Sequence, residues 1–346
     1  MSAHTIRNRL LFSILLGVLV YAGLTAFSDF DEVADSFGEF RWELLPLILL
    51  VTCGNYGLRF VKWEYYLRMI GVSGLRLSDS FLIYFSGLGM VVTPGKVGEW
   101  LKSYLLREMH GTPVMRSAPI LIAERLTDSL ALLVICGVGV VFFGPEYWWV
   151  VAVIAGASAV FVGVARHRPT AARLLDLIDR APVVGRFGHR FREMYDSTYI
   201  LMEPRAVLLM TGLSVGSWFF EVMAFYLTLI GLGVDGSIDT LLKAAFILPI
   251  ATLVAAIAIF APGGLGVAEG LLTSLSRELL HLSPGDGAVA TVIIRIATLW
   301  FGVAVGLAAF GVLTRKLARA GKSLDEAVAE EPDPLLLRGD PGEAPS

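Results

Sequence analysis

Two short motifs of the sequence combine proline, glycine and charged residues in an arrangement suited to holding an anion. They are Pro94-Gly95-Lys96-Val97-Gly98-Glu99 and Pro262-Gly263-Gly264-Leu265-Gly266-Val267-Ala268-Glu269. Proline cannot continue a preceding helix, and glycine lets the backbone approach a ligand closely. A helix that begins after such a turn directs unpaired N–H groups and the positive end of its dipole toward the turn. The motifs therefore predict two turns able to hold a group such as a phosphate, with Lys96 beside the first.

Polar side chains also recur inside long apolar segments. Asn55, Arg59 and Lys62 are spaced by four and three residues, which places them on one face of a helix. Two interpretations are open for Arg59 and Lys62. They contact a ligand within the membrane, or they extend along the helix to reach the headgroups near its end.

Three further polar residues raise the same question. Arg125 and Asp128 are three residues apart and are either ligand contacts or partners of one another. Arg295 lies deeper in its segment, with Glu269, Glu99 or a ligand anion as its candidate partners. An ionisable side chain at the centre of a bilayer costs about 2.5–3.5 kcal/mol on insertion scales, so each one requires a structural or functional reason.

The composition is that of a membrane protein. Hydrophobic residues make up 55% of the 346 residues and charged residues 17%, and the mean hydropathy is +0.70. Soluble domains average about 45–50% apolar and about 25% charged residues. The apolar segments are 10–28, 44–66, 80–93, 97–109, 116–143, 147–165, 205–230, 240–260, 265–280 and 287–314. The sequence therefore predicts an all-α polytopic membrane protein.

Two pairs of these segments are joined by the Pro-Gly motifs and read better as re-entrant hairpins than as full spans. They are 80–93 with 97–109, and 240–260 with 265–280. Irregular backbone at membrane depth, as at the tips of such hairpins, is tolerated only where protein or a water-filled cavity satisfies its polar groups. This interpretation leaves six full spans and two hairpins.

The charges of the loops orient the spans. Residues 28–43 hold six acidic residues and one arginine, whereas 166–205 hold eight arginines. Because cytoplasmic loops are enriched in lysine and arginine, the first stretch is expected outside and the second inside. Both termini are then cytoplasmic, and the location is the cytoplasmic (inner) membrane. The stretch 166–205 is either an amphipathic segment on the leaflet or a solvated loop, and 321–346 is expected to be a disordered tail.

An internal duplication is the main feature of the transmembrane domain, residues 1–320. Repeat one covers about 44–143 and repeat two about 205–314. The matched pairs, in order, are Tyr66–Gly71 with Tyr226–Gly231, Asp79 with Asp239, the two Pro-Gly motifs, and Arg125 with Arg295. The loop charges give the two halves opposite directions. An inverted repeat with paired broken helices is an architecture that places a transport site near the midplane.

At these residues the sequence resembles the lysylphosphatidylglycerol synthase transmembrane-region family, also called flippase-like integral membrane proteins. The match lies in the two Pro-Gly motifs and in Glu124-Arg125-Leu126-Thr127-Asp128, and it extends over about residues 8–318. The resemblance implies movement between leaflets of an aminoacylated phospholipid or a polyprenyl-phosphate-linked saccharide. The best-known members append a soluble aminoacyl-transfer domain. The roughly 30 residues after the last span are too few for one, so lipid aminoacylation by this chain is not expected.

The leading hypothesis is therefore translocation of an anionic lipid or lipid-linked saccharide, with the residues above as its binding site. A membrane glycosyltransferase or lipid-modifying enzyme, using Glu99, Asp128 or Glu269 as base, is an alternative, as is a non-transporting subunit of an envelope-lipid pathway. Neither a Walker loop, an acidic metal motif nor a nucleophile constellation is found, so the sequence predicts no catalytic residue, metal or cofactor. The net charge of −3 gives no reason to expect a nucleic-acid partner. A homo-oligomer or an envelope-biosynthesis partner stays open.

Overall fold

The computed structural model describes residues 30–91, 100–170, 172–173, 188–257 and 266–319, and this part of the chain is helical with no strand. Helices are the expected elements, because each satisfies its own backbone hydrogen bonds in a medium without water. Five helical stretches are long and apolar enough to cross a membrane: Trp42–Met69, Pro145–Arg166, Pro204–Gly231, Ile238–Ile257 and Pro284–Arg319. The prediction of an all-α polytopic membrane protein is confirmed.

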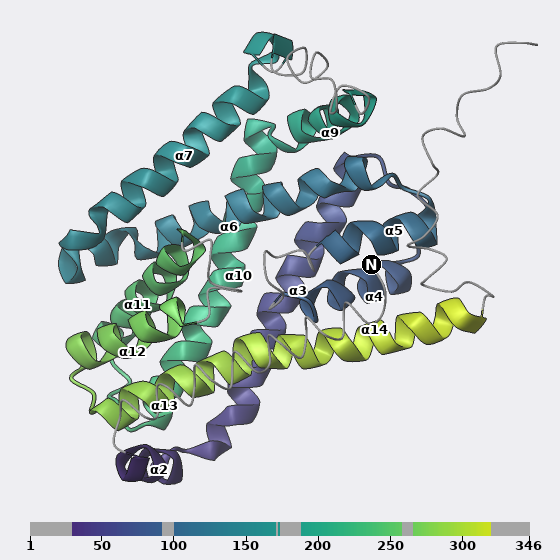
Figure 1. The fold of residues 1–346 in the computed structure, drawn as a ribbon. Helices are drawn as coiled ribbons and strands as arrows, with labels where there is room; N and C mark the ends of the chain where they lie inside the picture. The colour runs from purple at the N-terminus through teal and green to yellow at the C-terminus, as the bar shows by residue number, and fades with distance from the viewer. Residues whose placement is uncertain (1–29, 92–99, 171, 174–187, 258–265, 320–346) are drawn as a thin grey trace, which may run out of the picture.

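Figure 1 shows how the described helices are arranged. In chain order they are α2 (Phe30–Glu39), α3 (Leu45–Met69), α4 (Leu77–Leu88), α5 (Leu101–His110), α6 (Val114–Phe143), α7 (Trp148–Arg166), α9 (Gly188–Leu201), α10 (Pro204–Gly231), α11 (Ile238–Ile257), α12 (Val267–Leu280), α13 (Pro284–Arg295) and α14 (Phe301–Arg319). The 3-10 turns η1 (Trp42–Leu44) and η3 (Pro145–Tyr147) precede α3 and α7. A π-helical turn, η6 (Ile296–Trp300), joins α13 to α14.

These bounds follow the apolar segments of the sequence within a few residues. The clearest difference is α11, which was expected to be one arm of a hairpin. It is 20 residues long and apolar enough to cross alone, whereas α4, α5 and α12 are 12, 10 and 14 residues long. The first apolar segment, 10–28, and the tips of both predicted hairpins lie outside the described residues.

The two halves of the chain pack against one another in a reciprocal way. Helix α4 packs against α14, and α11 packs against α6, while α3 and α10 pack along one another. In Figure 1, α4 and α5 lie at the right and α11 and α12 at the left. Helix α14 of the second half thus packs on α4 of the first, and α6 of the first half packs on α11 of the second. The arrangement is the one that an inverted repeat would produce, and the repeat itself stays a prediction.

The backbones of α4 and α14 come into direct contact at two glycines. A Cβ atom built on Gly306 would lie 2.6 Å from Gly89 Cα and 2.8 Å from the carbonyl oxygen of Phe85. Near the other end of this contact, the ammonium of Lys316 on α14 pairs with the carboxylate of Asp79 on α4. The α4–α14 interface therefore depends on two residues without side chains at one end and on an ion pair at the other.

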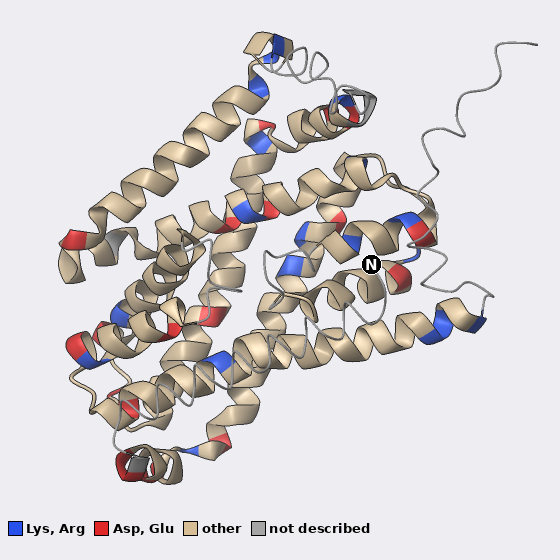
Figure 2. Ribbon diagram, viewed as in Figure 1, with Lys and Arg blue, Asp and Glu red and all other residues tan. Residues whose placement is uncertain are grey.

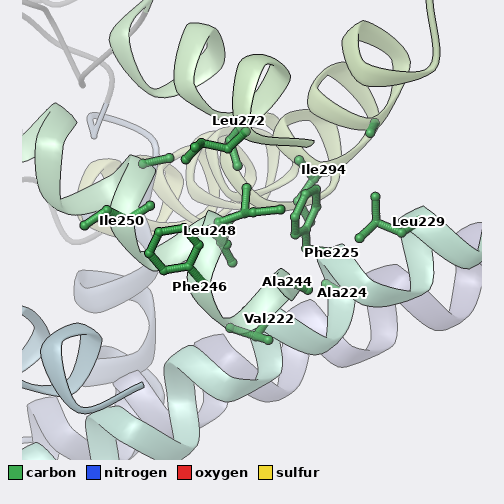
Figure 3. Packing of buried hydrophobic residues seen from close by; sticks show 14 of the residues in the cluster. Val222, Ala224, Phe225, Leu229, Ala244, Phe246, Leu248, Ile250, Leu272 and Ile294 are labelled. Carbon is green, nitrogen blue, oxygen red and sulfur yellow. The ribbon is translucent and has the colours of Figure 1, made fainter. Parts of the chain in front are cut away.

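Two apolar clusters form the core. One gathers residues of α10, α11, α12 and α13, including Phe225, Phe246, Leu272 and Ile294, whose side chains meet in Figure 3. Phe246 also fills space over α6, where a Cβ on Gly139 would clash with its ring. The other cluster joins α3, α4, α5, α6 and α14. The polar groups of α3 and α5 lie against the second cluster, where Lys102 is over the rings of Trp63 and Tyr84.

The ends of the long helices fall into two groups. In Figure 1 the starts of α3, α7 and α13 and the ends of α6 and α10 lie toward the lower left, and their opposite ends lie toward the upper right. Helix ends predicted to share a membrane side are thus grouped at the same end of the molecule. Which end faces the cytoplasm stays a prediction. The acidic stretch 28–43 contains a helix, α2, that packs against α13, so it is more ordered than a loop.

Candidate functional site

A pocket with an unusual concentration of charge lies among α3, α4, α5 and α6. Its empty volume is about 400 Å³, open solvent included. The described residues that line it are Arg59, Lys62, Tyr84, Gly87, Leu88, Val91, Lys102, Glu124, Arg125 and Asp128. Figure 2 shows the charged residues of α3, α5 and α6 close together in the middle of the molecule. Four of the lining side chains are cationic and two are carboxylates, which leaves two positive charges.

Asp128 is the centre of the best-defined charge network. Its Oδ2 atom lies 3.1 Å from Arg59 Nη1, and its Oδ1 atom lies 2.6 Å from Lys62 Nζ. Ser214 Oγ, on α10, donates to the same Oδ1 at 2.9 Å. Helices α3, α6 and α10 are therefore joined at one carboxylate. Both ion pairs that the described residues form with Asp128 come from α3, and Arg125 interacts with its charge from the same helix.

Lys62 is a fully buried member of this network. Its Nζ donates to Asp128 Oδ1, to Ser214 Oγ at 2.7 Å and to the carbonyl oxygen of Glu124 at 3.3 Å. An ammonium group has three donors, and three acceptors surround this one. The residue is 2% exposed, so it does not extend to the headgroups as one interpretation held. Lys62 holds the pocket wall together and has no donor left for a ligand.

Arg59 is held in a different way. Its guanidinium lies over the ring of Trp218, on α10, with Cζ 4.8 Å from the ring centroid. One face is thereby stacked while one edge pairs with Asp128. The Nε atom is buried without a hydrogen-bond partner among the described residues. The geometry fixes the plane of the guanidinium and leaves a donor that a ligand oxygen could satisfy.

Lys102 is the charged residue that α5 contributes to the pocket. Its Nζ pairs with Glu124 Oε2 at 2.7 Å and lies 5.0 Å from the ring centroid of Trp63 and 5.1 Å from that of Tyr84. Gly87 makes room for the side chain, since a Cβ at that position would lie 2.5 Å from Lys102 Cγ. The ammonium is thus held by one carboxylate and two ring faces.

A second charged cluster lies in the other half of the chain. Arg295 Nε donates to Glu269 Oε1 at 2.6 Å, and Glu269 Oε2 accepts the backbone N–H of Gly266 at 2.6 Å. Gly266 precedes α12 with a φ of +89°, which favours glycine. Glu269 is fully buried, and Arg295 Nη2 has no hydrogen-bond partner among the described residues. The sequence allowed three partners for Arg295, namely Glu269, Glu99 or a ligand anion. In the described residues Arg295 forms its ion pair with Glu269.

Glu221 on α10 connects the two clusters electrostatically. It interacts with Arg59 of the pocket and with Arg295 of the second cluster. One turn earlier on α10, Ser217 accepts the side-chain amide of Asn55 at 3.0 Å. Asn55 therefore fixes the α3–α10 crossing and is not part of the pocket lining described here.

The comparisons with known proteins identify the family. The family described as the lysylphosphatidylglycerol synthase TM region matches residues 14–306. The chain belongs to this family.

Two relatives show how far the likeness extends. A UPF0104 membrane protein of Methanothermobacter thermautotrophicus is 24% identical over 322 residues, which are 86% of this chain and 93% of that protein. Glycosyltransferase AglD of Haloferax volcanii is 23% identical over 326 residues, which are 84% of this chain and 52% of that protein. The chain thus spans about half the length of the second relative.

In this member of the family, the structure divides the predicted site residues into three groups. Arg59, Lys62, Arg125 and Asp128 line the pocket, and Gly266, Glu269 and Arg295 form the second cluster. Asn55 lies at a helix crossing. The predicted residues of the two turns lie outside the described residues, namely Pro94, Gly95, Lys96, Gly98, Glu99, Pro262, Gly263 and Gly264.

The prediction omitted several residues of the pocket. Lys102, Glu124 and Tyr84 line it, and Trp63, Ser214 and Trp218 hold its charged groups. Lys102 and Glu124 carry a sequence signal, since each is a charge within an apolar segment. The serine and the aromatic residues carry none, because such residues are common in membrane helices.

Proposed function

We propose that the chain moves an anionic lipid, or a polyprenyl-phosphate-linked saccharide, between the leaflets of the inner membrane. The observation that carries the proposal is the excess of two positive charges in a pocket between helices of an integral membrane protein. A lining with more cations than carboxylates attracts anions, and a phosphate entering the pocket would bind among these cations. The same attraction would draw the headgroup of an anionic lipid inward.

The pocket also has the donors that phosphate recognition uses. Arginine offers a planar fork of N–H groups, and Arg59 and Arg125 both line the pocket. Asp128 and Trp218 hold Arg59 in place, and Lys62 in turn holds Asp128. Charge-assisted hydrogen bonds of this kind are roughly twice as strong as neutral ones.

A route through the membrane follows from the reciprocal packing of the halves. Because α14 of the second half packs on α4 and α6 of the first half packs on α11, movement of one half against the other would open one end and close the opposite end. Glu221 would keep the pocket and the second cluster electrostatically coupled during such a movement. In this proposal the chain is a carrier and not an enzyme, and its partner is the lipid itself.

A membrane glycosyltransferase is the second candidate function. The relative named as a glycosyltransferase favours it, yet this chain aligns with 52% of that protein. Among the described residues there is no group of three histidine, cysteine or acidic side chains placed to hold a metal ion. The non-transporting subunit has no observation of its own in its favour.

Leaflet exchange in proteoliposomes tests the proposal. Labelled phosphatidylglycerol and a polyprenyl phosphate are placed in one leaflet, and their appearance in the other is followed with and without the protein. Replacing Arg125 by lysine keeps the charge but removes the fork, and we expect exchange to slow at least about tenfold, as for one lost charge-assisted hydrogen bond. Arg68→Lys, on the exposed end of α3, is the control and should exchange lipid at the parental rate. Exchange no faster than in protein-free vesicles for both lipids would overturn the proposal.

A further inference from the structure

We infer that the pocket selects lipid phosphates whose headgroups carry no ammonium group, and that it rejects aminoacylated phospholipids. The inference rests on the proposed function and narrows its substrate class. It concerns the pocket lined by Arg59, Lys62, Lys102, Arg125 and the two carboxylates, Glu124 and Asp128. A lysyl ester adds two ammonium groups to a headgroup with one phosphate, so its net charge is positive like that of the pocket.

The first step is the charge balance of the pocket. The described lining residues leave two positive charges. Residues 92–99, which lie outside the described part of the chain, hold one lysine and one glutamate. These two charges cancel one another, and counting Glu221 of α10, which interacts with Arg59, would leave an excess of one positive charge. A headgroup with a net positive charge would therefore meet like charge by either count.

The second step concerns the carboxylates, which are the natural partners of an ammonium group. Asp128 is already paired with Arg59 and Lys62, at 3.1 and 2.6 Å. Glu124 is already paired with Lys102 at 2.7 Å. A ligand ammonium could gain a carboxylate only by displacing a cation of the protein, which would leave that cation buried without a partner.

The third step concerns aromatic rings, the other partners that bind ammonium groups. Tyr84 is the aromatic residue among the described lining residues, and the ammonium of Lys102 already lies over its ring. Lys102 also lies over Trp63, and Arg59 lies over Trp218. The protein's own cations thus occupy the acceptors that an aminoacyl group would need, whereas Arg59 Nε is a donor without a partner among the described residues.

The chemistry recognised is a lipid phosphate, and two sources could supply it. One is a glycerophospholipid such as phosphatidylglycerol, and the other is a polyprenyl phosphate. Both present anionic phosphate oxygens without an ammonium group, so the pocket would treat them alike at this point. Their chains and attached groups would be distinguished elsewhere in the molecule.

The experiment compares three lipids in one proteoliposome assay: phosphatidylglycerol, lysyl-phosphatidylglycerol and a polyprenyl phosphate. The first two differ only in the lysyl group. Because like charges in contact cost several kcal/mol, we expect the lysyl lipid to exchange at least about tenfold more slowly than phosphatidylglycerol. Whichever of phosphatidylglycerol and the polyprenyl phosphate exchanges faster is identified as the source of the lipid phosphate. Equal or faster exchange of the lysyl lipid overturns the inference and leaves the proposed function standing. Exchange of none of the three overturns the proposed function itself.

A charge reversal gives an independent readout. Arg125→Glu removes the excess of two positive charges, and the residue is exposed enough for the fold to tolerate it. We expect the exchange ratio of phosphatidylglycerol to its lysyl ester to fall toward one, while Arg68→Glu should keep the parental ratio. Thermal unfolding in detergent checks that both variants are folded. If Arg125→Glu is not, Arg125→Gln replaces it, with a smaller fall expected. An unchanged ratio in a folded Arg125 variant contradicts the inference.

Discussion

Asp128 and Lys62 illustrate how one buried residue determines what its neighbours can do. Lys62 fills its three donors with Asp128, Ser214 and the Glu124 carbonyl, which come from α6 and α10. The lysine is therefore a positioning residue for the pocket. Its charge also balances Asp128, so that Arg59 does not have to neutralise the carboxylate alone.

The first prediction concerns this lysine. Lys62→Met keeps the length of the side chain but leaves Asp128 and Ser214 without their main donor. Removing one partner of a buried ion pair typically costs about 3–5 kcal/mol, and we expect a loss of this size in the free energy of unfolding. The measurement is denaturant or thermal unfolding of the purified protein in mild detergent. Lys243→Met is the control, because Lys243 pairs with the exposed Asp239 of its own helix and such pairs contribute about 0–1 kcal/mol. Equal losses in the two variants would show that Lys62 is not structural.

The residue types of the site could be predicted from the sequence, but their partners could not. Charges within apolar segments identified Arg59, Lys62, Arg125 and Asp128, because the cost of such charges implies a role. Spacing along one helix suggested Arg125 as the partner of Asp128. The actual partners lie on α3, more than sixty residues away in sequence, and only the packing of α3 against α6 brings them together.

Among elements, the contact of α4 with α14 is the closest helix–helix approach that glycine provides in the described residues. Small residues let membrane helices approach until their backbones touch, where packing and weak hydrogen bonds replace a hydrophobic driving force. The contact joins a short helix of the first half to the last long helix of the second. The sequence did not indicate it, because Gly89 and Gly306 are two among 36 glycines.

The second prediction tests this contact. Gly306→Ala places a methyl group against the backbone of Gly89, which cannot move aside as a flexible side chain could. We expect a loss of about 1–3 kcal/mol or more in the free energy of unfolding, as for an overpacked core. Gly311→Ala lies on the same helix with open space within 4 Å of its Cβ, so it should be neutral or stabilising by up to about 1 kcal/mol. Thermal unfolding would support the contact if Gly306→Ala lowers the stability and Gly311→Ala does not. Equal changes in stability would contradict it.

Element bounds were the most predictable part of the fold. Helices α3, α7 and α10 follow apolar segments read directly from the sequence, since a bilayer requires about 20 apolar residues per span. The arms of the predicted hairpins were harder to assign. Length alone does not distinguish a re-entrant arm from a tilted span, and α11 is long enough to be either. Helix α2 was not expected, because its acidic residues obscure the apolar face formed by Val33 and Phe37.

For the whole molecule, the arrangement of helix ends and the loop charges are independent observations that agree. The structure groups the starts of α3, α7 and α13 with the ends of α6 and α10 (Figure 1), without reference to charge. The loop charges assign one side to the same set of ends through the acidic stretch 28–43, and the other side through the arginines of 166–205. Sequence thus predicted which ends belong together, and it also predicts an absolute orientation that no contact within the protein reveals.

The last prediction concerns that orientation. Single cysteines at Asp35, on α2, and at Asp235, after α10, should react with a membrane-impermeant thiol reagent in intact cells, because both positions are exposed at the end expected outside. A cysteine at Ser73, exposed between α3 and α4, should react only after the membrane is permeabilised. The native Cys53 and Cys136 are first replaced by alanine, with unfolding measured because Cys136 is buried. Reversal of all three results would invert the molecule but keep the two groups of ends. Reaction of positions 35 and 73 from the same side would contradict the crossing of α3 itself, and with it the opposed halves on which a pathway through the membrane depends.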